Sequence, residues 1–155
     1  MEAATSGFNI RVACFAHTLQ LTVRDGLDHV HFLRPVMGKC SKLSNLVHQS
    51  AMFRASFEQQ FGSGHSIPVL NDTRWNSTYR QYSAILSLDK GMLRSLLTDV
   101  QMTHLLITER EYDQLSEVVN ILAPFADATD LTQGDHSITI SCVLPAVLVL
   151  NRALS

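Results

Sequence analysis

The chain has 155 residues, of which 46% are hydrophobic and 17% are charged, and this composition is typical of one globular domain rather than of a disordered segment. Its formal net charge of −2 argues against a dedicated polyanion-binding module, because non-specific DNA affinity depends on many Lys and Arg contacts. Cys14, Cys40 and Cys142 are too few and too widely spaced for a disulfide framework, which points to a reducing compartment.

Two further classes of protein are not expected. No apolar run reaches the roughly 18 residues that a membrane-spanning helix needs, so we expect no membrane partner. The first residues, Met1–Gly7, lack the basic start and the apolar centre of a signal peptide.

Two helices are expected before residue 62. Gly26 is well placed to end the first, and the second is a long amphipathic helix over about His31–Phe61, with Pro35 tolerated in its first turn. The first helix is indicated by apolar residues that recur at the spacing of one buried helix face, namely Val12, Phe15, Ala16, Leu19 and Val23.

The middle of the chain is expected to change from helix to extended backbone and back. Gly62–Ser66 should break the long helix, and Ile67–Leu70 should be extended, with a short strand possible, because the residue before a proline avoids the helical region. Asp72 can then cap a helix that carries aromatic residues on one face. That face consists of Trp75, Tyr79, Tyr82 and Leu86.

Three more helices are predicted in the second half. A short one covers about Met92–Val100, and a long one begins at a capping box formed by Thr108 and Glu111 and should kink at Pro124. After a turn at Gln133–Asp135, a closing helix is expected, in which Pro145 is awkward unless it falls in the first turn. The apolar stripe of this closing helix is Ile140, Val143, Leu144, Val147 and Leu148.

Two short stretches carry most of the candidate chemistry. The first motif is Cys14–Leu21, in which Cys14 and His17 lie at i and i+3 on a helix and could touch one metal ion together. A structural zinc site wants four ligands, and no second pair at ligand spacing follows. We therefore favour a buried small side chain for Cys14 and a hydrogen-bonded histidine for His17, and a catalytic thiolate is less favoured still.

The acidic residues also favour a structural interpretation. Asp127 and Asp130 lie one helical turn apart and could share a divalent cation, but a hard-cation site needs several converging oxygens, so a solvated face is favoured. Glu109, Glu111 and Asp113 fall in a first helical turn, where the helix dipole stabilises negative charge. The sequence predicts no metal and no cofactor.

The second motif is Asn71–Tyr79, which contains the only tryptophan. The indole of Trp75, the guanidinium of Arg74 and the small polar groups beside them would suit an unstacked nucleobase. The alternative is that Trp75 packs on Tyr79 and on Phe side chains of the long helix as a core anchor, with Arg74 at the rim. The residues alone favour the core role and leave the other open.

Four blocks in this order resemble a known family. The first motif and Asp72–Tyr79 are similar to the paired signatures of hAT-superfamily transposases, and most similar to those of their domesticated relatives, the zinc-finger BED-domain-containing proteins. Leu122–Thr129 and Thr139–Pro145 resemble the helical region of the same family. The resemblance covers nearly the whole chain.

The resemblance implies an RNase H-like catalytic core interrupted by an all-helical insertion domain. Its two catalytic Asp residues would precede Met1 and its Glu would follow the end of the chain, so none of the three has a matching position here, and two-metal strand cleavage needs such carboxylates. The BED finger also has no counterpart. By the same resemblance, Cys14 and His17 mark a helix beside the former catalytic site. Trp75 matches the tryptophan that stabilises a flipped base, with Arg74 as its neighbour.

We therefore expect a mainly α fold, a single partial hAT transposase-like domain over residues 1–155. Residues 1–70 would be the remnant of the RNase H-like core with the long helix, and residues 71–155 the helical insertion region. The expected function is that of a catalytically inactive, transposase-derived nuclear protein, associated with DNA or transcription. Expected partners are DNA, a second copy or other hAT-derived proteins. One alternative is part of an active hAT transposase, and another is a helical protein-interaction or dimerisation module.

Overall fold

The computed structural model describes residues 15–71, 75–132 and 147, and within these ranges the chain forms helices and no strand. The prediction of a mainly α fold is confirmed. No helix in the described ranges is long and apolar enough to cross a membrane. The closing helix expected around 140–148 lies outside the described residues, apart from Val147. In chain order the elements are α1 (Phe15–His29), η1 (His31–Leu33), α2 (Arg34–Gln49), α3 (Ala51–Phe61), α4 (Trp75–Ser87), α5 (Lys90–Asp99), η2 (Thr103–Leu105) and α6 (Glu109–Thr132).

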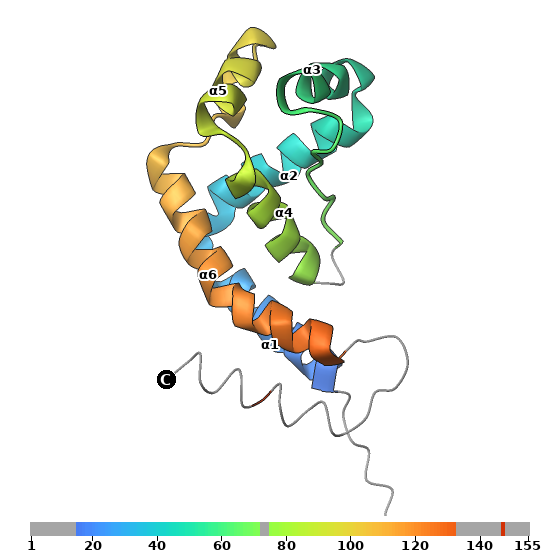
Figure 1. The fold of residues 1–155 in the computed structure, drawn as a ribbon. Helices are drawn as coiled ribbons and strands as arrows, with labels where there is room; N and C mark the ends of the chain where they lie inside the picture. Colours follow the sequence, from blue (N-terminus) through green and yellow to red (C-terminus); the bar gives the residue numbers. More distant parts are fainter. Residues whose placement is uncertain (1–14, 72–74, 133–146, 148–155) are drawn as a thin grey trace, which may run out of the picture.

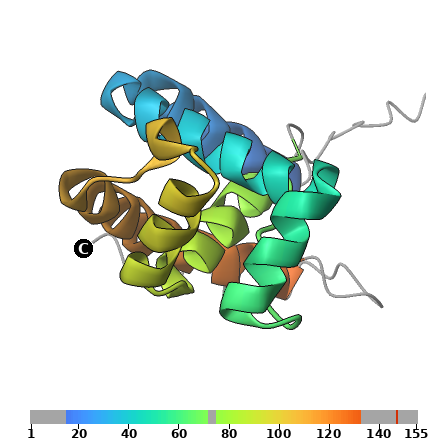
Figure 2. The ribbon, with the colours of Figure 1, turned by 90° about the horizontal axis from the view of Figure 1, so that it is seen from above.

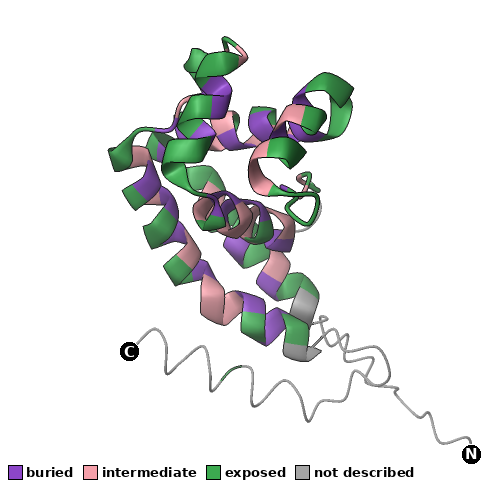
Figure 3. Ribbon diagram, turned by 45° about the horizontal axis from the view of Figure 1, so that its top comes forward, coloured by how far each residue is buried: buried purple, intermediate pink, exposed green. Residues whose placement is uncertain are grey.

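The helices are arranged around α4. This helix packs against α6, α2 and α1, while α1 also lies along α6 and α3 contacts both α2 and α5 (Figure 1). Buried positions face inward on each of these helices (Figure 3). A main core results, with a small second cluster formed by Leu19 and Ala128. The fully buried large side chains of the main core include Tyr82, Phe57, Leu33, Leu43, Ile85, Leu97 and Leu115.

Helix α1 continues past the glycine that was expected to end it. It runs three residues beyond Gly26 to His29, so that expectation was wrong. On its exposed side, Arg24 lies 3.9 Å from Asp28 and Asp25 lies 3.7 Å from His29, both at the i,i+4 spacing that supports a helix. These pairs span Gly26, where a glycine costs only about 1 kcal/mol relative to alanine.

The predicted long helix is two helices that meet at Ser50. The backbone of Ser50 is extended (φ −104°, ψ 109°), and its hydroxyl accepts a hydrogen bond from the Phe53 N–H at 3.2 Å, so Ser50 ends α2 and caps α3. Arg54 of α3 donates to the carbonyl oxygens of Val47 (2.9 Å) and His48 (2.6 Å) at the end of α2. Figure 2 shows α3 turning away from α2 at this corner. The apolar pattern continues through the corner because both helices pack on the same core, and this made the break invisible in the periodicity.

The extended segment before the second motif is held by side chains instead of by a neighbouring strand. The Ser44 hydroxyl lies 2.9 Å from the Pro68 carbonyl oxygen and 3.1 Å from that of Ile67. His48 Nε2 donates to the Ile67 carbonyl at 2.8 Å, and Gln81 Nε2 donates to the Pro68 carbonyl at 2.9 Å. The short strand considered possible here does not form, because these side chains occupy the carbonyl groups that a strand would use.

The expected capping box opens α6. The Thr108 N–H donates to Glu111 Oε2 at 2.8 Å, and the Glu111 N–H donates to Thr108 Oγ1 at 3.3 Å. The same carboxylate accepts a hydrogen bond from Lys39 of α2 at 2.7 Å, and Lys39 also donates to the Leu106 carbonyl at 2.8 Å. A single lysine thus ties α2 to the start of α6. The helix then continues through Pro124 to its end.

Replacing Lys39 with Met should lower the free energy of unfolding by about 2 kcal/mol near neutral pH, because a partly buried carboxylate loses a charge-assisted hydrogen bond. Burial acts to raise the pKa of Glu111, but hydrogen bonds from Lys39 and Thr108 outweigh it and hold this pKa below its ordinary value of 4.5. The folded-state pKa is the lower one, so the stabilisation is complete above 4.5 and is lost as the pH falls through the depressed value. Urea unfolding of both chains across this pH range measures the difference.

The matched control is Lys42→Met, which removes an exposed lysine from the same helix. It should leave the unfolding free energy almost unchanged. Equal losses in the two variants, or a loss at Lys39 that does not shrink in acid, would show that the Lys39–Glu111 contact does not stabilise the fold.

Cys40 provides a second test of the core. Burial raises the pKa of its thiol to about 12, and the nearby Glu111 carboxylate adds to the rise. Since the thiolate is the reactive species, we expect iodoacetamide to modify Cys40 at least about a hundredfold more slowly in the folded chain than in urea. Mass spectrometry of the Cys40 peptide follows the reaction, and rapid labelling in native buffer would contradict the packing of α2.

Candidate functional site

A hydrogen bond joins the two motifs that the sequence singles out. The backbone N–H of Trp75, at the start of α4, donates to Oε1 of Gln20 in α1 at 3.2 Å. Gln20 belongs to the first motif and Trp75 to the second, 55 positions further along the chain. The amides at a helix start have no partner inside their own helix, and this side chain supplies one.

Asn71, the last described residue before α4, is fixed to the same helix. The Asn71 N–H donates to the Ser77 hydroxyl at 2.9 Å, and that hydroxyl lies 3.1 Å from the Asn71 carbonyl oxygen. Asn71, the first residue of the second motif, is therefore positioned by a side chain of α4. The extended segment and the helix form two sides of one corner.

This corner and α1 enclose a cleft of about 260 Å³. Its walls combine apolar and polar side chains in similar measure. Arg24 and Asp28, the two charged residues of the lining, lie 3.9 Å apart on the exposed side of α1. The charge of the cleft is therefore close to zero. The complete lining is Arg24, Leu27, Asp28, Met37, Leu70, Asn71, Trp75 and Thr78.

Trp75 is at once a wall of this cleft and a member of the core. Its side chain is 5% exposed and belongs to the main buried cluster, in which Tyr79 packs at the edge. The indole Nε1 is buried and has no hydrogen-bond partner among the residues that the structure describes. This geometry favours the core-anchor interpretation of Trp75, while its stacking on a nucleobase stays a prediction.

The other predicted site residues are placed only in part. His17 is exposed in the first turns of α1. Cys14 and Arg74 lie outside the described residues. Within the described ranges, no group of three or more His, Cys, Asp or Glu side chains is arranged to hold a metal ion. Asp130 is exposed and lies 3.8 Å from Arg80.

Sequence reasoning gave no role to Arg24 and Asp28, which line the cleft, or to Gln20, which bonds the backbone of Trp75 beside it. Gln20 was quoted within the first motif, but Arg24 and Asp28 were not singled out at all. A usable signal existed, because these residues lie at i+3, i+7 and i+11 from His17, on one face of a helix, and α1 runs on past Gly26. Because the helix was expected to end at Gly26, Asp28 was not assigned to the same helix face.

Trp75 reports on the fold as the single tryptophan of the chain. We expect its fluorescence emission to lie at short wavelength in the folded chain and to shift to longer wavelength in urea, because the indole leaves an apolar environment. Trp75→Ala should lower the free energy of unfolding by about 3–5 kcal/mol, as for other large-to-small core changes. Trp75→Phe is the control and should retain most of the stability. Emission typical of a hydrated indole, in a chain whose circular dichroism is helical, would contradict the burial.

Comparison with known proteins places this site within a family. The family model described as the ZBED1 RNase-like helical domain matches residues 12–121, a range that includes both motifs and the cleft. Zinc finger BED domain-containing protein 4 of Homo sapiens is 19% identical over 155 residues, which is 97% of this chain and 13% of that protein. No solved structure matches. The chain belongs to the family of the ZBED1 RNase-like helical domain and is thus of the ZBED type, derived from hAT transposases.

Proposed function

We propose that the chain is a non-catalytic helical domain of a nuclear, DNA-associated protein of this family, and that the cleft beside Trp75 contacts nucleic acid. The observation that carries the proposal is the hydrogen bond from the Trp75 N–H to Gln20, because it brings the two motifs together at one cleft. The two motifs are the parts of the chain that resemble transposase signatures. Their meeting at a concave, partly polar surface favours a binding role.

The lining has the groups that an unstacked nucleotide would use. Leu27, Met37 and the edge of the indole offer apolar contact for a base, while Asn71 and Thr78 offer an amide and a hydroxyl group. Arg24 supplies a guanidinium group, which can bind a phosphate through two parallel hydrogen bonds. Such a combination suits single-stranded nucleic acid without strong sequence preference.

The charges predict weak binding. Asp28 lies 3.9 Å from Arg24 and opposes a phosphate at the same place, and the chain as a whole carries a formal charge of −2. Few counterions would be released, so the affinity should be low and its dependence on salt shallow. Sequence-specific binding by the longer protein would come from a BED finger, which the resemblance places elsewhere.

The non-catalytic part of the proposal rests on which region is matched. The matching model is described as the RNase-like helical domain and covers residues 12–121. None of the catalytic carboxylates that the resemblance implies has a matching position within this range. The chain spans 13% of the length of the human relative. Activity, nuclear location and partners of a whole protein of this kind are therefore part of the proposal.

The proposal is tested by titrating the chain into a fluorescently labelled single-stranded oligonucleotide and following anisotropy. Arg24→Gln should weaken binding about fivefold and make the salt dependence shallower, because a phosphate contact is lost. Asp28→Asn should strengthen binding by a similar factor, because the repulsion is removed. Both residues are exposed, so both variants should stay folded.

Arg110→Gln is the matched control, since it removes an exposed cation in the first turn of α6, at the other end of that helix from the contact with α1 (Figure 1). It should leave the affinity unchanged. If Arg24→Gln and Arg110→Gln weaken binding equally, the contact is diffuse and the cleft is not the site. If Asp28→Asn has no effect, phosphate does not approach this part of α1.

A further inference from the structure

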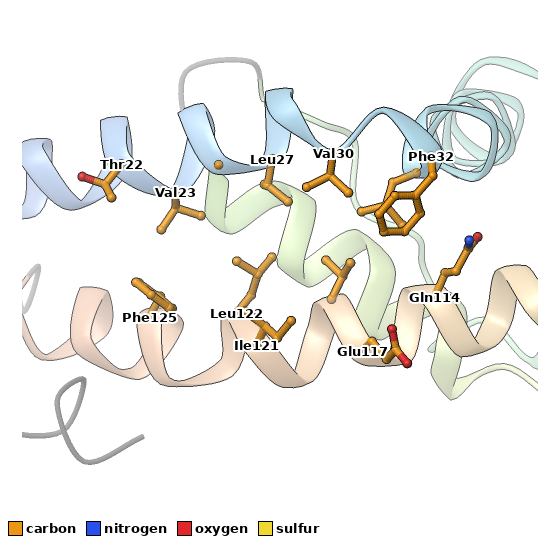
Figure 4. A pocket seen from close by; sticks show the side chains of 13 residues that line it. Thr22, Val23, Leu27, Val30, Phe32, Gln114, Glu117, Ile121, Leu122 and Phe125 are labelled. Atoms are coloured by element: carbon orange, nitrogen blue, oxygen red, sulfur yellow. The ribbon is translucent and has the colours of Figure 1, made fainter. Parts of the chain in front are cut away.

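A second concave surface lies on the neighbouring face of α1. An apolar groove of about 350 Å³ runs between α1 and α6 (Figure 4). Its main apolar lining is Val23, Leu27, Val30, Val118, Leu122 and Phe125. The polar groups of Gln114 and Glu117 lie towards one end, and among the described residues the lining contains no cation. This surface therefore suits apolar protein side chains and not a phosphate.

Phe32 is an apolar projection at the end of the groove where Gln114 lies (Figure 4). Its side chain is 64% exposed, whereas the next residue, Leu33, is 2% exposed and packs in the main core. The Leu33 N–H donates to the Val30 carbonyl at 3.2 Å. Because Leu33 is buried and bonded in this way, the short helix η1 is held in place and Phe32 has a fixed position.

Gly26 leaves a gap in the α1 wall of the same groove. A Cβ at this position would meet no atom of the described residues within 4 Å. The helical backbone of α1 does not need a glycine here, and a glycine inside a helix costs about 1 kcal/mol relative to alanine. A missing side chain on a groove wall lets a group from another molecule approach the backbone closely.

The projection and the gap are placed so that two copies of the surface fit each other. Phe32 and Gly26 lie six residues apart, which is about 9 Å along α1. In a twofold interface, if residue i of one copy contacts residue j of the other, then j also contacts i. A twofold axis that crosses the groove midway between Gly26 and Phe32 therefore places each Phe32 ring over Gly26 of the other copy.

Ile121 supports the same axis from the α6 wall. Its side chain is 61% exposed and lies across the groove from Leu27 and Val30, the residues between Gly26 and Phe32 (Figure 4). The two copies of Ile121 would therefore meet close to the axis and cover each other. Glu117 would lie at the edge, where the polar groups of an interface keep contact with water.

We infer that two copies of this chain associate face to face through the α1–α6 groove, about a twofold axis that places Phe32 of each copy over Gly26 of the other. Exposed apolar groups of this size mark a surface that a partner covers. A second copy is favoured over an unrelated protein because the ring and the gap that receives it lie on one surface. The inference goes beyond the proposed function, and association is measured without nucleic acid, so each can fail alone.

Filling the gap tests the inference, because it should affect the fold and the association in opposite directions. Gly26→Leu should raise the urea midpoint of the dilute chain, since leucine has the higher helix propensity. It should weaken association at least about tenfold, because the leucine takes the place of the Phe32 ring. Sedimentation equilibrium of the full chain in a reducing agent measures the association constant.

The matched control is Gly38→Leu in α2, where a Cβ also meets no atom of the described residues within 4 Å and which is outside the groove lining. It should raise the urea midpoint in the same way and leave association unchanged. A chain that stays monomeric at about 0.1 mM, where even a weak interface is populated, would overturn the inference. So would a dimer that Gly26→Leu and Gly38→Leu weaken equally.

Removing the projection is the second test. Phe32→Ala should weaken association at least about tenfold, because an aromatic anchor at the centre of a small interface carries much of its affinity. Met52→Ala is the control, since Met52 is 82% exposed on α3 and should not affect association. Circular dichroism shows that each variant keeps its fold. A dimer that Phe32→Ala weakens but Gly26→Leu does not would show that the ring does not meet Gly26, and the twofold fit would be wrong.

Discussion

Backbone groups outside the helices need hydrogen-bond partners, and in the described chain helix side chains provide them. Ser44 and His48 of α2 and Gln81 of α4 hold the carbonyl groups of residues 67 and 68, and Lys39 holds the carbonyl of Leu106. In a sheet protein, neighbouring strands would satisfy such groups. Here a few polar residues on otherwise apolar helix faces decide where each connection lies. The position of the second motif depends on them, because residues 67–71 lead directly into it.

The elements that sequence reasoning found are those with a local signature. The capping box of Thr108 and Glu111 is complete within four residues, and the aromatic face of α4 is a matter of spacing alone, so both were predictable. The break at Ser50 was not, because one extended residue between two helices that share a core leaves the apolar period intact. The predicted helix end at Gly26 was wrong because a local signal was given too much weight. Glycine has a low helix propensity, but here it lies in a helix that the packing and ion pairs of its neighbours hold together.

The candidate site shows the same division. The two motifs could be located from sequence, and the family to which they point is the one that the chain belongs to. The cleft between them could not be foreseen, because it depends on Gln20 reaching a backbone amide 55 residues away and on α1 continuing to His29. Contacts between distant residues of different helices carry no periodic signal in a single sequence. The surroundings of Trp75 are of this kind, since the residues that line the cleft with it come from α1, α2 and the extended segment.

One side chain is common to both concave surfaces. Leu27 lines the cleft at the two motifs and also the groove between α1 and α6. A displacement of α1 that moves this side chain in one surface also moves it in the other. A ligand that displaced α1 at one surface would therefore change the shape of the second. Thermodynamics requires such linkage to be reciprocal: if the first event changes the affinity of the second by some factor, the second changes the first equally.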